Sequence, residues 1–195
     1  MLAFDVEGKE PARIYAIGIR NCVELAIHPK SGDVWCTTNE RDGLGDDLVP
    51  DYTTRVREGA FYGWPRCYLG SHEDLRHAGE RPDLAGKVTL PGVLFQAHSA
   101  SLTLAFYEAE AGVAAFPPEF LGDAFVALHG SWNRSHRTGY KVVRVGFKDG
   151  APTGAYEDFL TEFVVDDANV WGRPVGVAVA HDGALIVSDD DSNTL

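Results

Sequence analysis

The sequence has few cationic residues and lacks any long apolar run. Its 17 lysines and arginines stand against 29 aspartates and glutamates, which gives a formal net charge of −12. Because phosphate binding needs a basic surface, this balance argues against a nucleic-acid partner. Since no apolar run is long enough to cross a bilayer, we expect no membrane span. The first ten residues have neither the basic nor the apolar segment of a signal peptide.

Cysteine is also scarce, and its spacing excludes the common metal-binding patterns. The three cysteines, Cys22, Cys36 and Cys67, are an odd number without metal-ligand spacing. Cys22 and Cys36 flank a predicted hairpin, which would bring them close in space. We interpret all three as small buried hydrophobic residues. A Cys22–Cys36 disulfide is the alternative.

Helical periodicity over a dozen residues is absent, whereas strand-turn-strand patterns recur. Turns are expected at Gly32, Gly122 and Gly183, each between two apolar segments. The predicted strands are residues 23–28, 34–38, 93–95, 102–107, 124–129, 140–147 and 156–165, followed by the two strands around Gly183. The first and last units each begin just after an arginine, Arg20 and Arg173, and each ends in a polar loop. The fold class is therefore all-β, with its chemistry at the rim of the repeats.

A repeated strand-turn-strand unit is typical of a β-propeller. Propeller blades take about 40 to 50 residues each, and complete rings have about 4 to 8 blades. We predict that residues 1–195 form one partial propeller domain of roughly three blades plus part of another. The domain is expected to be truncated at the N-terminus and slightly at the C-terminus. An open ring of this kind exposes apolar blade faces and sheet edges.

Acidic residues cluster in two loops. They are Asp42, Asp46, Asp47 and Asp51 in the first loop and Asp189, Asp190 and Asp191 in the second. One reading is a solvated loop surface. The other is a site for a hard cation such as calcium, which takes carboxylate and carbonyl oxygens from irregular loops. The sequence leaves both readings open.

Three blocks of motifs carry a resemblance to a known family. They are GIRN (18–21), NERDGLGDD (39–47) and FYGWP (61–65), then AHSA (97–100) and GDAFVALHGSWNRS (122–135), then WGRPV (171–175) and DGALIVSDD (182–190). In this order they resemble the C-terminal half of the sorbosone and aldose sugar dehydrogenases that use pyrroloquinoline quinone (PQQ). The resemblance implies about half of a six-bladed propeller, with PQQ and calcium at the mouth of its channel.

The resemblance also implies roles for individual residues. Arg20 and Asn21 match the cofactor-contacting pair, and Asn39 falls where a polar side chain faces the quinone. Two further residues, Glu40 and Arg41, fall where backbone carbonyls hold calcium. Arg134 and Arg173 would face the PQQ carboxylates, and His98 would form part of the pocket wall.

These roles suit the chemistry of the cofactor. A flat tricarboxylate needs cationic, fork-shaped partners, which arginine supplies. A bound calcium would polarise the quinone carbonyl as a Lewis acid, and a general base must take the proton of the sugar hydroxyl. In the family that base is a histidine of the N-terminal half, which this sequence lacks, so its catalytic residues stay unknown.

The sequence departs from the family pattern at some positions, among them Glu24, Thr38 and Glu40. Glu40 stands where relatives have glycine, which restricts the backbone expected to face calcium. Two other functions stay open: a non-catalytic propeller acting as a binding module, and a calcium-dependent hydrolase of the lactonase kind. The expected ligand is a small sugar, and the full-length relatives imply a periplasmic or secreted location. If the chain is complete, we expect a homodimer.

Overall fold

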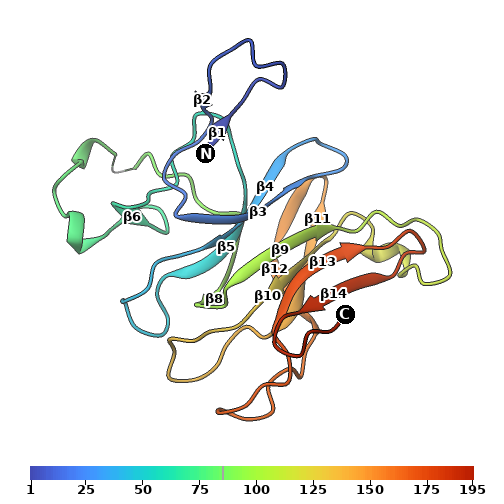
Figure 1. The fold of residues 1–195 in the computed structure, drawn as a ribbon. Coiled ribbons are helices and arrows are strands. Elements are labelled where there is room, and N and C mark those ends of the chain that lie inside the picture. The colour runs from blue at the N-terminus through green and yellow to red at the C-terminus, as the bar shows by residue number, and fades with distance from the viewer. Residues whose placement is uncertain (85) are drawn as a thin grey trace.

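The computed structural model describes residues 1–84 and 86–195, and its regular structure there consists of strands and three short 3-10 turns (Figure 1). Two antiparallel sheets have four strands each. The first sheet has the order β3 (Asn21–Ile27), β4 (Val34–Asn39), β5 (Pro50–Arg55) and β8 (Val93–Ala97). The second has the order β9 (Ser101–Phe106), β10 (Ala124–Leu128), β11 (Lys141–Lys148) and β12 (Ala151–Leu160).

Three smaller sheets of two strands complete the described residues. The pair β13 (Pro174–Val179) and β14 (Leu185–Asp189) packs beside the second large sheet. The others are β1 (Leu2–Ala3) with β2 (Arg13–Ile14), and β6 (Cys67–Tyr68) with β7 (His72–Glu73). The short turns are η1 (Leu75–His77), η2 (Pro82–Leu84) and η3 (Pro118–Phe120). As Figure 1 shows, the β1–β2 hairpin and the segment around β6 project away from the large sheets.

The predicted all-β half-propeller is confirmed, with fewer complete blades than the sequence analysis expects. The described residues form two four-stranded blades and a two-stranded part of a third, instead of roughly three blades and part of another. The difference arises because long excursions take up residues between strands, above all the segment from 56 to 92. Strand β5 was also missing from the prediction, because PDYTTR lacks apolar alternation and buries threonines instead.

The core lies between the blades. Side chains of the first sheet, led by Trp35 and Phe95, pack against Phe106, Val126 and Val145 of the second. A further cluster joins the second sheet to β13 and β14. Apolar burial of this kind stabilises the stack by roughly 25 cal/mol per Å² of surface removed from water. The blades are therefore held face to face, with β3 and β13 both packed against β9.

An apolar blade face is open, as expected for part of a ring. On β3 the side chains of Val23, Leu25 and Ile27 are exposed. Leu25 and Ile27 pair across the sheet with Cys36 and Val34, so they share the face that points away from the second blade. No helix within residues 1–84 and 86–195 has the length and apolar character needed to cross a membrane.

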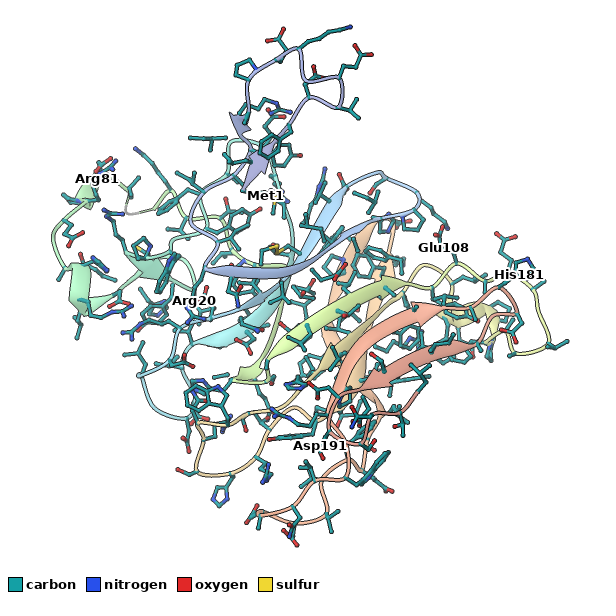
Figure 2. The ribbon with its side chains drawn as sticks, in the orientation of Figure 1. Met1, Arg20, Arg81, Glu108, His181 and Asp191 are labelled. Carbon is teal, nitrogen blue, oxygen red and sulfur yellow. A yellow bond between two sulfur atoms is a disulfide. The ribbon has the colours of Figure 1, made fainter. Side chains whose placement is uncertain are left out.

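Cys22 and Cys36 form a disulfide, which corrects their interpretation as unpaired hydrophobic residues (Figure 2). Cys22 pairs with Thr38 across the sheet, two residues along the strand from Cys36, so both sulfurs lie on one face. The Cα atoms are 5.8 Å apart, within the normal range for a disulfide. The hairpin register therefore decides a pairing that spacing alone left open. Cys67 is a free, half-buried thiol.

The strands place three loops at the same end of the blades. These are the loops 40–49 after β4, 129–140 after β10 and 161–173 after β12, all on the lower side in Figure 1. The tight turns at Gly32 and Gly150 lie at the opposite end of the sheets. All the residues that the sequence analysis selects for a site belong to the loop end.

Candidate functional site

Two neighbouring cavities at the loop end, which have Trp132 in common, together contain most of the predicted site residues. The first, of about 200 Å³, is called here the acidic cavity and is lined by Arg20, Asn21, Asn39, Glu40, Asp42, Asp51, His98, Ala100, Trp132 and Asn133. The second, of about 370 Å³, is called the arginine cavity and is lined by Ser131, Trp132, Arg134, Ser135, Arg137, Tyr140, Asp167 and Arg173. Trp132 belongs to both.

The structure brings seven of the eight predicted site residues to these cavities. Arg20, Asn21, Asn39, Glu40 and His98 line the acidic cavity, whereas Arg134 and Arg173 line the arginine cavity. Arg41 lies outside both linings, because its side chain is buried against Asp74, with Nε 2.6 Å from Oδ2. Residues as far apart in the sequence as Arg20 and Arg173 thus lie at one rim.

Arg20 is held in place by main-chain oxygens and an aromatic ring. Its Nη1 donates to the carbonyl oxygens of Asn39 at 3.0 Å and Glu40 at 2.7 Å. Its guanidinium lies over the ring of Trp64, 5.5 Å from the centroid, and Nη2 is 3.7 Å from Asp42 Oδ2. Arg20 therefore presents a fixed, half-buried cation to the cavity.

Two buried carboxyl groups stand beside Arg20. Asp51 Oδ1 accepts the N–H of Glu40 at 2.8 Å, and its Oδ2 accepts the N–H of Ala100 at 2.7 Å. Asp51 thereby ties the loop after β4 to the β8–β9 connection. Burial raises the pKa of Asp51 to about 6 and that of Glu40 to about 7.

His98 connects the loops on either side of the acidic cavity. Its Nε2 donates to the Gly45 carbonyl at 2.9 Å, so Nδ1 is the acceptor for Asn133 Nδ2 at 3.2 Å. Asn133 also donates to Asp42 Oδ1 at 2.7 Å. The family resemblance predicts His98 as part of the pocket wall, whereas Asn133, which lies inside the HGSWNR segment, is a site residue that only the structure reveals.

The arginine cavity contains the least committed cation of the predicted set. Arg173 Nη2 donates to the Gly130 carbonyl at 3.2 Å, and within the described residues the buried Nε has no partner. Arg134, by comparison, pairs with Asp47 at 3.0 Å. Most of the hydrogen-bonding capacity of Arg173 is therefore available to an anion in the cavity.

Tyr140 contacts three residues that line the arginine cavity and holds them in position. The guanidinium groups of Arg137 and Arg173 lie 5.4 and 5.6 Å from its ring centroid. Its hydroxyl donates to the Ser131 carbonyl at 2.5 Å and accepts from Arg137 at 2.9 Å. Gly130 makes this packing possible, because a Cβ there would collide with the Tyr140 ring. Arg137 and Tyr140 are site residues that the sequence motifs do not predict.

The predicted calcium site does not fit these contacts. The Glu40 carbonyl that would face calcium, and that of Asn39 beside it, already accept hydrogen bonds from the Arg20 guanidinium. Among residues 1–84 and 86–195, no three His, Cys, Asp or Glu side chains gather in a way that could hold a metal ion. Calcium binding by Glu40 and Arg41 therefore stays a prediction that the geometry does not support.

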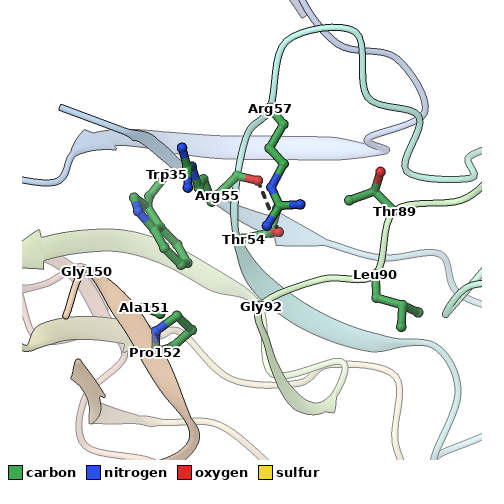
Figure 3. Close-up of a pocket in the computed structure, with 10 residues that line it drawn as sticks. All are labelled: Trp35, Thr54, Arg55, Arg57, Thr89, Leu90, Gly92, Gly150, Ala151 and Pro152. Atoms are coloured by element: carbon green, nitrogen blue, oxygen red, sulfur yellow. Dashed lines mark hydrogen bonds between the residues drawn. The ribbon is translucent and has the colours of Figure 1, made fainter. Parts of the chain in front are cut away.

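A third cavity lies at the opposite end of the blades and contains none of the predicted residues (Figure 3). It measures about 120 Å³ and lies between the first and second sheets, where Trp35 and Gly92 face Pro152. Its polar groups come from Arg55, Arg57 and neighbouring threonines. The candidate site is accordingly the pair of cavities at the loop end.

The raised pKa of Glu40 predicts a pH-dependent stability difference. The pKa of Glu40 is about 7 in the folded chain, above its ordinary value of 4.5, so the folded state binds more protons between these values. Wild-type stability should therefore fall relative to Glu40→Gln as pH rises from about 4.5 to 7, by up to about 3 kcal/mol, and then level off. Urea unfolding of both chains across this range measures it. A constant difference at all pH values would contradict the assignment.

Comparison with known proteins adds a family model and several relatives. The TrAA12-like family model matches residues 84–195. An uncharacterized protein of Borreliella burgdorferi is 31% identical over 93% of this chain and 47% of its own length. A pyrroloquinoline quinone-dependent pyranose dehydrogenase of Coprinopsis cinerea is 33% identical over 92% of this chain and 30% of its own.

Solved structures share the fold. A Trichoderma reesei protein of carbohydrate-active enzyme family AA12 matches with a TM-score of 0.74 at 23% identity, over 91% of this chain and 52% of that one. The holo PQQ domain of the Coprinopsis cinerea pyranose dehydrogenase gives a TM-score of 0.71 at 22% identity, over 95% and 55%. The chain thus spans about half the length, or less, of the relatives it matches.

Proposed function

The chain belongs to the TrAA12-like family, and from this premise we propose that it binds both the carboxylate end and the quinone end of PQQ as part of a PQQ-dependent sugar dehydrogenase. Its relatives include an enzyme named as a PQQ-dependent pyranose dehydrogenase. The observation that carries the proposal is the arginine cavity. There Arg173 has N–H groups that make no hydrogen bond among the described residues, and Arg134 and Arg137 lie beside it. In a chain of net charge −12, such a cationic recess is a specific feature that favours an anionic ligand.

The two cavities suit the two ends of PQQ. Arginine forks bind carboxylates in bidentate fashion, so the arginine cavity would take the carboxylate end. Arg20, Asn21 and Asn39 would face the quinone end from the acidic cavity, where Arg20 presents a fixed cation to an oxygen that gains negative charge. PQQ supplies the two-electron acceptor when bound, and the protein supplies binding, orientation and electrostatics.

A sugar substrate suits the polar lining of the acidic cavity. The carboxyl groups of Glu40 and Asp42 can accept hydrogen bonds from sugar hydroxyl groups, and the amide of Asn133 can both donate and accept them. We assign no general base to this chain, and the proposal does not depend on calcium.

The proposal is tested by PQQ binding and sugar oxidation. Equilibrium dialysis should show that the chain retains PQQ, and the native polypeptide loaded with PQQ should reduce a dye when aldoses are added. Failure to retain PQQ at saturating concentration would contradict the function. Lactone hydrolysis without PQQ would instead favour the hydrolase alternative, and PQQ retention without any sugar oxidation would favour a binding module.

A further inference from the structure

Trp132 is the most exposed tryptophan of the chain, with 80% of its surface open to solvent. Each of the other three has a clear structural environment. Trp35 is buried between the blades, and Trp64 lies between Arg20 and Arg76. Trp171 stacks on Phe163 at 4.7 Å and donates from Nε1 to the Glu162 carbonyl. A large aromatic side chain exposed to solvent at the rim is therefore a candidate ligand-binding surface.

The loop that carries Trp132 is firmly held on both sides of it. Before it, the Ser131 N–H donates to the Thr138 carbonyl at 2.9 Å. After it, Asn133 donates to Asp42, and Arg134 pairs with Asp47 at 3.0 Å. The backbone is thus fixed to the loop after β4, and the indole is exposed on an ordered support instead of a loose loop tip.

Trp132 lies where the two cavities meet, because it belongs to the lining of both. The acidic cavity has Arg20, Asn21 and Asn39, and the arginine cavity has Arg134, Arg137 and Arg173. A rigid ligand with one end in each cavity would pass the residue that the two linings have in common. A planar fused ring would do so with its face against the indole.

We propose that Trp132 is the stacking platform for the central ring of the PQQ tricycle. This inference rests on the proposed function and adds a binding residue to it. A flat, electron-poor quinone ring and an electron-rich indole attract each other when offset-stacked, and both are rigid, so little conformational freedom is lost on binding. The arginines at one end and Arg20 at the other then fix the position of the ring along the platform.

The test compares PQQ affinity in three variants by equilibrium dialysis. Trp132→Ala should bind PQQ about tenfold more weakly than wild type, because it loses the stacking surface. Trp132→Phe should keep most of the affinity, because phenylalanine preserves a smaller aromatic face. Trp171→Phe is the matched control, an exposed tryptophan outside both cavities, and should bind like wild type.

A spectroscopic readout separates stacking from a general loss of structure. In wild type, PQQ should quench a large part of the tryptophan fluorescence, and Trp132→Phe should lose that part while still binding the cofactor. Equal PQQ affinity in wild type and Trp132→Ala would overturn the inference and leave the proposed function standing. A wild-type chain that retains no PQQ would overturn both.

Discussion

The Arg173→Ala variant is expected to bind PQQ about a hundredfold more weakly than the wild-type chain. Arg173 lines the arginine cavity, and its guanidinium has only one hydrogen bond among the described residues, to the Gly130 carbonyl. Its other donors are therefore available for a carboxylate. Removing a charged partner from a partly desolvated pair costs roughly 2 to 5 kcal/mol, which is larger than the loss of a stacking contact.

Two further variants make this measurement specific. Arg173→Lys keeps the charge but lacks the planar fork, so its affinity should lie between wild type and Arg173→Ala. Arg55→Ala removes an arginine from the cavity at the other end of the blades and should leave PQQ binding unchanged. Equal losses in Arg55→Ala and Arg173→Ala would show that net charge, and not the arginine cavity, determines binding.

The Asp74→Ala variant is expected to lose about 3 to 5 kcal/mol of unfolding free energy. The Asp74 side chain is almost fully buried and lies 2.6 Å from Arg41 Nε, while Arg76 donates to it from Nε and Nη2. Alanine would leave the buried guanidinium of Arg41 without its counter-charge. Because Arg41 belongs to the loop after β4, the same change should loosen one wall of the acidic cavity.

The pKa of Asp74 sets the pH range of this contribution. The hydrogen bond from the Arg76 side chain holds the pKa of Asp74 at about 2, below its ordinary value of 3.8. Its stabilising effect is thus present above about pH 4 and is lost as pH falls through about 2. Urea unfolding at neutral pH compares Asp74→Ala with Asp83→Ala, whose solvent-exposed pair with Arg81 should contribute much less to the free energy of unfolding than the buried Asp74. Similar losses in the two variants would contradict the prediction.

Much of the fold could be predicted from the local pattern. The turns at Gly32 and Gly183 lie where the sequence analysis expects them, between β3 and β4 and between β13 and β14. These strands contain short runs of apolar residues, and a tight turn joins the two strands of each pair, so the information is local. Strand β5 was not predicted because its buried residues are threonine, aspartate and tyrosine. These polar side chains can be buried only where neighbouring strands and loops form hydrogen bonds with them.

The sequence motifs predict the charged residues that line the site, but they do not predict the residues that hold them in place. Arg20, Asn39, Arg134 and Arg173 were selected from motif resemblance, and the structure places all of them at the two cavities. Arg137 and Tyr140 cannot be predicted in this way, because their roles depend on an aromatic ring that contacts two guanidinium groups in the folded chain. Arg41 was selected for its backbone, but its side chain is fixed by Asp74, from a distant part of the chain.

Local sequence patterns are enough to predict the all-β class, the resemblance to half of a sugar dehydrogenase propeller and the arginines at its rim. These depend on periodicity, turn residues and motifs, which are properties of neighbouring positions. Three features follow only from the folded arrangement: the Cys22–Cys36 disulfide, the hydrogen bond from Arg20 to the Glu40 carbonyl, and the place of Trp132 in the linings of both cavities. Each of these depends on strand register or on loops from different blades, and such distances are set by packing across the sheets.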